Sequence, residues 1–569
     1  MTDFHRGDAM NTAWTENVDR NNPLPEYPRP QLARRGWMIL NGEWDYAIND
    51  SSRFPKEFDG KILVPFSPES ELSGVGRTLK SGQFLWYRRE IVLPEDFLDW
   101  RLILHFGAVD QSAAVWVNST QVASHMGGYL SFDADVTDAV EDGIMNITVR
   151  VTDDTEKGGH SRGKQKSSPG GIWYTAQSGI WQTVWLEAVP ETYVKSLRIT
   201  PDVDSMSVEI EADICGDEQT PAYARVFGQD YILPADIPVP EAELWSPESP
   251  NLYGFEVFCG EDEVQSYFAM RKISVEKDED GIPRLFLNNR PCFQNGVLDQ
   301  GYWPDGLYTA PTDEALIYDI SMAKAMGFNM IRKHVKVEPM RWYYHCDRLG
   351  MLVWQDMPNG GAPAMASAVL SGMKDSAYSL FGRGSRDNRE EFRTELAGLV
   401  NQLYNCPCIV MWVIFNEGWG QFDAAQMYNL VTGMDKTRLA DHASGWHDQG
   451  VGKLKSEHVY RKNYSFRPDK KGRAVILSEF GGYGQMILGH CMSEKYMSYR
   501  KFEMPAQLEI GVEELYEDQI APAKAAGLAA CVYTQLCDVE NELNGIMTYD
   551  RKVAKIPPEI MHKITDVGI

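Results

Sequence analysis

The sequence predicts a multidomain protein in which two β-sandwiches precede a (β/α)8, or TIM, barrel. Its 569 residues exceed what a single hydrophobic core accommodates, so several domains are expected. Short β-type runs separated by turn residues fill residues 1–276, whereas from residue 277 apolar runs alternate with stretches of helical period. A third observation is that two of these apolar runs end in a glutamate. The predicted domains are residues 1–190, 191–276 and 277–569.

Residues 1–190 are predicted to form a β-sandwich, because runs such as FLWYRREIVL, SAAVWVN and MNITVRV recur at the spacing of sandwich strands. The stretch Glu156–Gly171, EKGGHSRGKQKSSPGG, interrupts this pattern with basic residues and glycines. Such a stretch is either a mobile solvated loop or a substrate-contacting one, and the sequence favours the former. Residues 191–276 contain the strand runs of a small immunoglobulin-like sandwich, which we expect to be a scaffold without chemistry.

Residues 277–569 show the alternation of strands and helices that is typical of a parallel barrel. Pro311–Met326 is a predicted helix with Thr312 as its N-cap and acidic residues in its first turn. Pro339–Leu349 is the next predicted helix, and it precedes the strand MLVWQD. The least distinct strands are those expected near His442–Trp446 and His458–Tyr460. The long Gly-, Ala- and Ser-rich segment 357–388 is predicted to be a loop that covers a site.

Composition excludes several classes of partner. The formal net charge of −26 argues against nucleic acid, because phosphates would be repelled, and does not favour an anionic membrane surface. No apolar run approaches the length of a membrane span, and the first 30 residues contain no apolar segment of a secretory signal. Nine cysteines without framework spacing are expected to be reduced thiols of a cytoplasmic protein. Cys and His do not cluster at metal-ligand spacing, so we expect neither a metal nor another cofactor.

Two glutamates carry the chemistry that the sequence predicts. The run Ile409–Gly420, IVMWVIFNEGWG, ends in Asn416 and Glu417, and the run AVILSEFGG ends in Glu479. Reacting groups of a parallel barrel lie at the carboxyl ends of its strands. Retaining glycoside hydrolysis needs two carboxyl groups about 5–5.5 Å apart, one as acid/base and one as nucleophile. The sequence therefore predicts a glycosidase; the alternative, that each glutamate pairs with an arginine at a barrel end, is less favoured for both together.

Several ordered motifs resemble glycoside hydrolase family 2, the β-galactosidase and β-glucuronidase family. They are VIFNEGWG, ILSEFGG and, upstream of both, IRKHVKVEPMRWYYHCDRLGMLVWQDMP. WYRREIVLP, VWVN and SGIWQTVWLE resemble the family's N-terminal jelly roll, a sugar-binding-like sandwich, and LWSPESPNLY and FAMRKI resemble its immunoglobulin-like domain. The resemblance covers nearly the whole chain and implies a retaining exo-β-glycosidase with an oligosaccharide or glycoside as substrate. Family members often form oligomers, so a homo-oligomer is possible.

The resemblance also implies roles for single residues. Glu417 corresponds to the general acid/base and Glu479 to the nucleophile. Arg332 corresponds to an arginine close to the nucleophile, and Tyr460 to a tyrosine that hydrogen-bonds it. The remaining candidate substrate-binding residues, for each of which a rim salt bridge or packing is an equal alternative, are Asn416, Asp299, Trp303, His334, Lys336, Trp446, His447 and His458.

The sugar is less well determined, because family 2 acts on galactosides, glucuronides, mannosides, glucosaminides and some pentosides. Family glucuronidases hold the sugar carboxylate with an Asn-x-Lys motif after the eighth strand, and the stretch Glu540–Ile546 lacks that lysine. We therefore rank a β-galactoside first and a uronide or a pentoside (arabinoside) second. Lys333, Lys336 and the RGKQK run offer a uronide another route. A non-catalytic carbohydrate-binding protein and a barrel metallohydrolase are the rivals of other classes.

Overall fold

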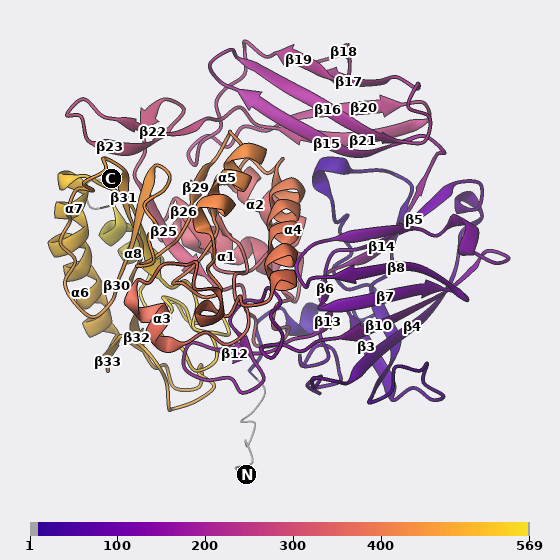
Figure 1. Cartoon of the computed structure of the whole chain (residues 1–569), viewed down its shortest axis with the longest axis horizontal. Helices are drawn as coiled ribbons and strands as arrows, with labels where there is room; N and C mark the ends of the chain where they lie inside the picture. Colours follow the sequence, from indigo (N-terminus) through magenta and orange to yellow (C-terminus); the bar gives the residue numbers. More distant parts are fainter. Residues whose placement is uncertain (1–9, 567–569) are drawn as a thin grey trace.

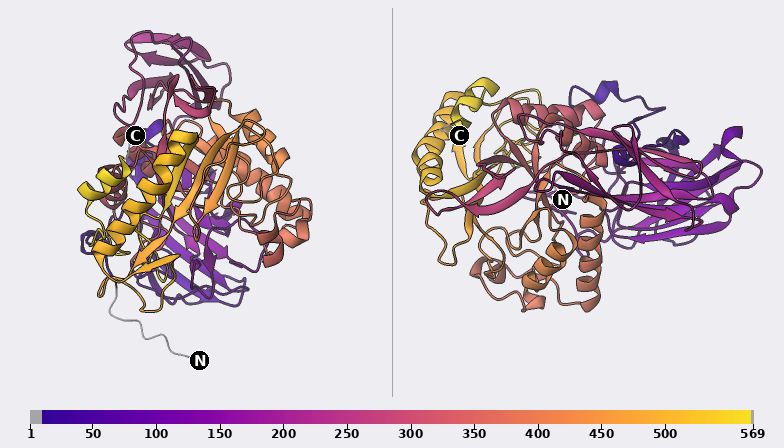
Figure 2. Two further views of the ribbon diagram at one scale, coloured as in Figure 1. Left: turned by 90° about the vertical axis from the view of Figure 1, so that its left-hand side faces the viewer. Right: turned by 90° about the horizontal axis from the view of Figure 1, so that it is seen from above.

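The computed structural model describes residues 10–566, and these form three bodies packed on one another. In Figure 1 the N-terminal sandwich (indigo to purple) lies beside the barrel (pink to yellow), and a second sandwich (magenta) lies above both. Figure 2 shows the first sandwich and the barrel side by side when the molecule is seen from above. Among residues 10–566, no helix combines the length and the apolar character needed to cross a bilayer.

The N-terminal sandwich consists of a six-stranded sheet of order β3-β2-β4-β10-β7-β8 and a four-stranded sheet of order β1-β14-β5-β9. In β10, Met145, Ile147, Val149 and Val151 are buried while the residues between them are not, which is the alternation of a sheet with one face in the core. The strands are β1 Trp37–Ile39, β2 Gly42–Asn49, β3 Gly60–Val64, β4 Phe84–Val92, β5 Arg101–Phe106, β7 Ser112–Val117, β8 Thr120–Met126, β9 Phe132–Asp135, β10 Ile144–Thr152 and β14 Val184–Val189.

The second sandwich pairs a sheet of order β15-β16-β19 with one of order β18-β17-β20-β21. Its strands are β15 Tyr193–Asp202, β16 Ser207–Cys215, β17 Ala222–Val226, β18 Gln229–Ile232, β19 Ala235–Pro238, β20 Tyr253–Cys259 and β21 Asp262–Phe268. Trp245, which is fully buried, donates its indole N–H to the Asp347 carbonyl oxygen at 2.8 Å. Arg271 donates to the carbonyl oxygens of Pro407 and Ile409 at 2.9 and 3.0 Å. These contacts fasten the sandwich to the barrel, consistent with the expected scaffold.

The barrel is an eight-stranded, all-parallel sheet of order β29-β28-β27-β26-β25-β34-β31-β30. Its strands are β25 Gln294–Asp299, β26 Met330–Lys333, β27 Leu352–Asp356, β28 Ile409–Val413, β29 Leu439–Asp441, β30 Leu454–Val459, β31 Ala474–Gly481 and β34 Leu528–Thr534. Every residue of β28, β31 and β34 is buried, which explains why these strands are continuous apolar runs without alternation. The predicted TIM barrel is therefore confirmed.

Helices surround this sheet, and their caps agree with the sequence patterns. The Thr312 hydroxyl accepts a hydrogen bond from the Ala315 N–H at 3.3 Å at the start of α1, as predicted. Gly350 ends α2 with a φ of +70°, a conformation that favours glycine. The helices are α1 Asp313–Ala325, α2 Met340–Leu349, α3 Ala366–Ser371, α4 Arg386–Leu403, α5 Ala424–Met434, α6 Pro505–Leu515, α7 Ala521–Ala526 and α8 Pro558–Thr565.

Two connections depart from the ideal repeat. In the described chain no helix follows β29 or β30, and irregular loops occupy 442–453 and 460–473. The strand expected near His442–Trp446 is β29, which lies earlier, at Leu439–Asp441, because the Gly-, Ser- and His-rich residues after it belong to a loop. The strand expected at His458–Tyr460 is β30, which ends at Val459. Both loops reach the end of the barrel where the two predicted glutamates lie.

Smaller elements complete the fold. Short strands are β6 Val109–Asp110, β11 Gln165–Lys166, β12 Tyr174–Thr175, β13 Gly179–Ile180, β22 Ile273–Lys277, β23 Pro283–Leu287, β24 Arg290–Pro291, β32 Tyr483–Gln485 and β33 Arg500–Phe502. Short 3-10 helices lie at Thr15–Asn17, Pro30–Leu32, Glu95–Phe97, Thr137–Ala139 and Tyr378–Phe381, and a π-helical turn at Tyr516–Ile520 joins α6 to α7. Tyr129, Tyr174 and Trp181 of the first sandwich are buried in the same apolar cluster as the barrel core. That sandwich is thus part of the barrel's packing.

Candidate active site

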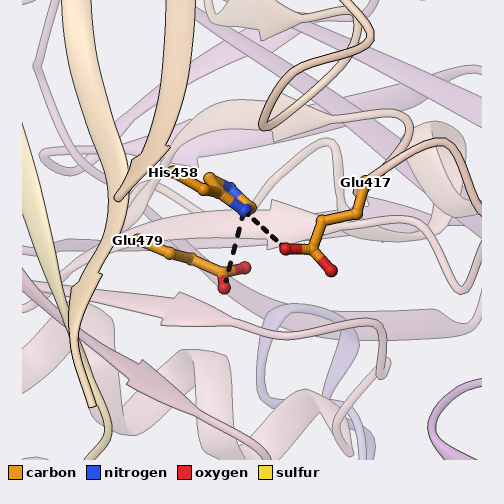
Figure 3. A group of neighbouring side chains, drawn as sticks. All are labelled: Glu417, His458 and Glu479. Atoms are coloured by element: carbon orange, nitrogen blue, oxygen red, sulfur yellow. Dashed lines mark hydrogen bonds and ion pairs between the residues drawn. The ribbon is translucent and has the colours of Figure 1, made fainter. Parts of the chain in front are cut away.

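The structure brings the two predicted glutamates together, with His458 between them (Figure 3). Glu479 lies in β31, and Glu417 lies just after β28 in the left-handed region, with a φ of +52°. One oxygen of each carboxyl group and a nitrogen of His458 lie within 4.8 Å of one another. This separation fits a retaining pair, whereas an inverting pair leaves about 6.5–9.5 Å for a water molecule.

His458 contacts both glutamates through one ring nitrogen. Its Nδ1 lies 2.9 Å from Glu417 Oε1 and 3.6 Å from Glu479 Oε2. Its Nε2 lies 2.8 Å from the Ser444 hydroxyl, which donates to the Ser478 hydroxyl at 3.0 Å. Because Ser444 thereby accepts from His458 Nε2, the ring orientation is fixed and Nδ1 points into the site.

Glu479 is held by two donors. Arg332 Nη1 donates to its Oε1 at 3.1 Å, and the Tyr460 hydroxyl donates to its Oε2. Burial by itself raises the pKa of the Glu479 carboxyl, but the charges of His458 and Arg332 and the Tyr460 hydrogen bond outweigh it and lower that pKa. The carboxylate is therefore ionised near neutral pH and held in one orientation, which a nucleophile requires.

Arg332 is itself fixed by Asp356, a residue that the sequence analysis missed. Arg332 is fully buried in β26, and its Nε and Nη2 donate to the two Asp356 carboxylate oxygens at 3.0 Å each. Burial raises the pKa of Asp356 to about 6, although Arg332 opposes this rise. The signal was present in the sequence: Asp356 ends the apolar run MLVWQD as Glu479 ends AVILSE.

Asn416 and His334 complete the set of side chains around Arg332 and Glu479. Asn416 Oδ1 accepts from Arg332 Nη2 at 3.0 Å, which leaves its amide N–H groups to donate elsewhere. His334 Nδ1 lies 3.0 Å from Gln300 Oε1, and its Nε2 lies 3.6 Å from Glu479 Oε1. Burial, aided by the charges of Lys164 and Arg332, lowers the pKa of His334 well below its usual value, so the ring is neutral. Within the described residues His334 Nε2 has no hydrogen-bond partner.

Two family models match this chain. The model described as "Glycosyl hydrolases family 2, sugar binding domain" matches residues 77–190, and the one described as "Glycosyl hydrolases family 2, TIM barrel domain" matches residues 283–520. The chain belongs to glycosyl hydrolase family 2. This confirms the resemblance drawn from the sequence and the expected class, a glycoside hydrolase, and it makes carbohydrate the substrate class of the family.

Relatives of family 2 carry more than one name. The chain is 26% identical over 454 residues to a β-glucuronidase of Rattus norvegicus, covering 68% of this chain and 65% of that one. It is 25% identical over 450 residues to a β-galactosidase of Leuconostoc mesenteroides, covering 72% of this chain and 39% of that one. A putative β-glucuronidase of Formosa agariphila is 25% identical over 359 residues, covering 58% and 39%. The chain thus spans between about two fifths and two thirds of the length of these relatives.

Solved structures of family 2 share the fold. A β-glucuronidase of Ruminococcus gnavus aligns with a TM-score of 0.74 at 16% identity, covering 96% of this chain and 100% of the other. A family 2 β-galacturonidase of Eisenbergiella tayi bound to galacturonate aligns with a TM-score of 0.71 at 18% identity, covering 95% and 99%. At such identities the likeness establishes the architecture alone.

Tyr460 lies where the family resemblance implied, beside Glu479. Its ring stacks on Tyr499 with the centroids 3.7 Å apart, and its hydroxyl also lies 3.1 Å from the Thr534 hydroxyl. No sequence signal identified Tyr499, which comes from the loop before β33. Trp446 lies at the rim: 39% of it is exposed, and its ring packs edge-on against His458 at 5.9 Å.

Three predicted sugar contacts of this family 2 chain have structural partners instead. Asp299 pairs with Lys333, and Lys336 Nζ donates to the Gly301 and Tyr308 carbonyl oxygens and to Glu338 at 2.6–2.9 Å. Trp303 is buried under the Arg551 guanidinium, which lies 4.0 Å from its ring centroid. Their polar groups and ring faces have protein partners, which is the structural alternative that the sequence left open, and sugar contact for these residues stays a prediction.

His447, the weaker candidate beside Trp446, is also structural. It is buried, its Nε2 contacts the Val369 carbonyl oxygen, and a Cβ added at Gly418 would lie 2.6 Å from its ring. The ring therefore fixes the turn that follows Glu417. Gly418, with a φ of +75°, meets both the conformational and the steric demand of that turn.

The basic stretch Glu156–Gly171 packs against the barrel. Arg162 forms an isolated β-bridge with Gly360, and Arg383 Nη1 donates to the Gly159 carbonyl oxygen at 2.8 Å. Lys164 is buried, and its charge is among those that lower the pKa of Glu479. The favoured interpretation of a solvated loop is therefore wrong, because Gly159 and Arg162 of this stretch contact the barrel domain through their backbone.

Glu417, His458 and Glu479 also form the one group of the described residues whose donor atoms are close enough to hold a metal ion. Arg332 argues against a cation there. Its guanidinium lies 3.1 Å from Glu479 and already neutralises the negative charge that this carboxylate would offer to a metal.

Proposed function

We propose that this chain is a retaining exo-β-glycosidase that works by double displacement. The observation that carries the proposal is the pair Glu417 and Glu479, delivered by β28 and β31, with carboxyl oxygens within 4.8 Å of each other. A rigid barrel holds this separation, because the two strands are separate members of one hydrogen-bonded sheet.

In the first step Glu479 attacks the anomeric carbon and forms a covalent glycosyl-enzyme, while Glu417 gives a proton to the leaving oxygen. Arg332 and Tyr460 keep Glu479 ionised and aimed before attack. In the second step Glu417 takes a proton from water, which displaces Glu479 from the sugar. His458 Nδ1, 2.9 Å from Glu417, holds that carboxyl group toward the bond in both steps.

For the sugar, a terminal β-galactoside is the first candidate. Glu542 and Asn544 lie in the stretch where family glucuronidases carry Asn-x-Lys, and a glutamate there binds neutral hydroxyls better than a carboxylate. A β-uronide is the second candidate, supported by the many β-glucuronidases among the relatives and by the buried cation of Lys164.

The test is hydrolysis of a panel of nitrophenyl β-glycosides, followed by NMR of the first product formed. We expect the β-anomer of the released sugar to appear first and the α-anomer to accumulate only through mutarotation. Initial release of the α-anomer, or ligand binding without turnover across the panel, would refute the proposal.

A further inference from the structure

One lysine of the N-terminal domain lies buried beside Glu542, which follows the last barrel strand. Lys164 belongs to the basic loop that interrupts the strand pattern of that domain. The preceding residue allows the loop to approach the barrel: a Cβ at Gly163 would lie 2.8 Å from the Val335 carbonyl oxygen and closer still to the Tyr308 hydroxyl. Any larger residue at 163 would push the loop away and withdraw Lys164.

The side-chain nitrogen of Lys164 lacks the partners that other buried lysines have. Lys164 is 6% exposed, and its nearest charged neighbour is Glu542, with Nζ 3.8 Å from Oε2, beyond hydrogen-bonding distance. No hydrogen bond from another residue of the described chain reaches this Nζ. By contrast, Lys333 and Lys336 donate to two and three protein oxygens respectively.

Glu542 does not neutralise Lys164 fully, because its oxygens face other donors. Its Oε2 accepts from the Tyr174 hydroxyl, and its Oε1 accepts from Asn544 Nδ2 at 3.1 Å. A buried cation with free N–H groups is costly unless a ligand supplies acceptors. Lys164 lies near the barrel mouth: the residue before it, Gly163, abuts the carbonyl oxygen of Val335, which follows His334, and Lys164 Nζ lies 3.8 Å from Glu542, which follows the last barrel strand. In agreement with this position, its charge acts on both Glu479 and His334.

We propose that Lys164 is the specificity residue of this site, and that it binds the carboxylate of a terminal β-linked uronic acid. The proposal rests on the retaining β-glycosidase function proposed above and selects its second sugar candidate. The Tyr174 hydroxyl and Asn544 Nδ2 hydrogen-bond the two Glu542 oxygens, whereas Lys164 Nζ has no hydrogen bond to any described residue and is left to pair with an incoming carboxylate.

The experiment compares nitrophenyl β-galacturonide and β-glucuronide with nitrophenyl β-galactoside in the wild type, Lys164→Met and Lys164→Arg. We expect Lys164→Met to lower kcat/KM for the uronides about 100-fold, as loss of a buried charge partner does, with less than about a 3-fold change for the galactoside. Lys164→Arg, which keeps the charge, should retain most of the uronide activity. Glu542→Gln should raise the preference for uronides by removing the repulsion.

Lys166→Met is the matched control, because Lys166 lies in the same loop but its Nζ lies over the Trp173 ring, 4.2 Å from the centroid, and not beside Glu542. It should leave the ratio of the two activities unchanged. The assignment would be overturned if Lys164→Met lowered kcat/KM equally for both sugars, lowered it for the galactoside alone, or did not lower it at all. So would a wild type that cleaves galactosides and no uronide, although the proposed glycosidase function would then stand.

If the wild type hydrolyses none of these glycosides, the proposed glycosidase function fails, but the role of Lys164 can still be tested. Calorimetry then compares the binding of free galacturonate with that of galactose. We expect galacturonate to bind more tightly to the wild type and equally weakly to Lys164→Met. Should Lys164→Met not fold, as judged by circular dichroism, Lys164→Gln replaces it. Binding of galacturonate that is indifferent to residue 164 would reject the role of this lysine.

Discussion

Strand β26 carries two adjacent cations, Arg332 and Lys333, and each lies in a different buried ion network. Successive strand residues point to opposite faces, so Arg332 reaches Asp356 and Glu479, whereas Lys333 reaches Asp299 and Glu338. In the Lys333 network every charged group forms an ion pair with another charged side chain of the protein. In the Arg332 network Glu479 also faces His458 and Glu417, the other two members of the candidate active site.

The comparison teaches that burial and charge alone do not mark a catalytic group. Both networks are buried to nearly the same degree, and both shift pKa values: that of Lys333 is raised above its usual range by Asp299 and Glu338 against the effect of burial. What distinguishes the surroundings of Arg332 and Glu479 is a buried polar atom without a hydrogen-bond partner among the described residues, His334 Nε2. The predictions below perturb the two networks in turn and end at a residue of the rim.

The largest effect is expected for Glu479→Ala. Loss of a nucleophile should lower kcat by about four orders of magnitude or more. The substitution leaves the Lys333 network untouched, so circular dichroism and the melting temperature should show an intact fold. Near-normal hydrolysis by this variant would reject the assignment of the nucleophile.

The next largest effect separates the two networks directly. Arg332→Met leaves Asp356 and Glu479 as buried charges without their partner, and should both lower kcat by about 1,000-fold and destabilise the fold by about 3–5 kcal/mol. Lys333→Met should also destabilise the fold, because it leaves Asp299 buried without its cation and Glu338 with Lys336 alone, yet it should leave kcat of the folded fraction within about 3-fold. Denaturant unfolding measures the stability of both variants, and steady-state kinetics measures their kcat. Equal kinetic losses would show that the networks are not separate.

Tyr460→Phe removes one donor to Glu479 and should act through pH. The hydroxyl lowers the pKa of Glu479, so its loss should raise that pKa. Because the ionised form is the nucleophile, the acidic limb of kcat/KM should move to higher pH, and kcat at the optimum should fall about 10–100-fold. A pH profile checks this, with Tyr499→Phe as control, which retains the stacked ring. An unmoved acidic limb would contradict the role of the hydroxyl.

The smallest effect is expected at the rim. Trp446→Ala removes an exposed ring that packs on His458 without touching either network. We expect KM to rise about 3–10-fold with kcat nearly constant, as for a residue that binds substrate and transition state equally. A fall in kcat without a change in KM would instead mean that Trp446 positions His458.

Much of this site could be predicted because its signals are local. A strand buried on both faces must be a continuous apolar run, and a carboxylate at its end has left the core, which identified Glu417 and Glu479. The same signal at Asp356 was overlooked, although no long-range information was needed to find it. For Asp299, Lys336 and Trp303 the sequence left packing and sugar binding as equal alternatives, because the same strand-end position serves either, and the structure adds their protein partners.

The sequence by itself determined the order of the domains, the barrel and the two glutamates that meet at its carboxyl end, since each follows from the periodicity and the polarity of contiguous residues. Only the tertiary structure decided which polar groups at the barrel mouth are satisfied and which stay free. That outcome depends on partners far apart in the chain, such as Lys164 of the first domain and Glu542 after the last strand, which are separated by 378 positions in the sequence and by 3.8 Å in space. Hydrogen bonding is decided by distance and angle in three dimensions, and no local pattern encodes either.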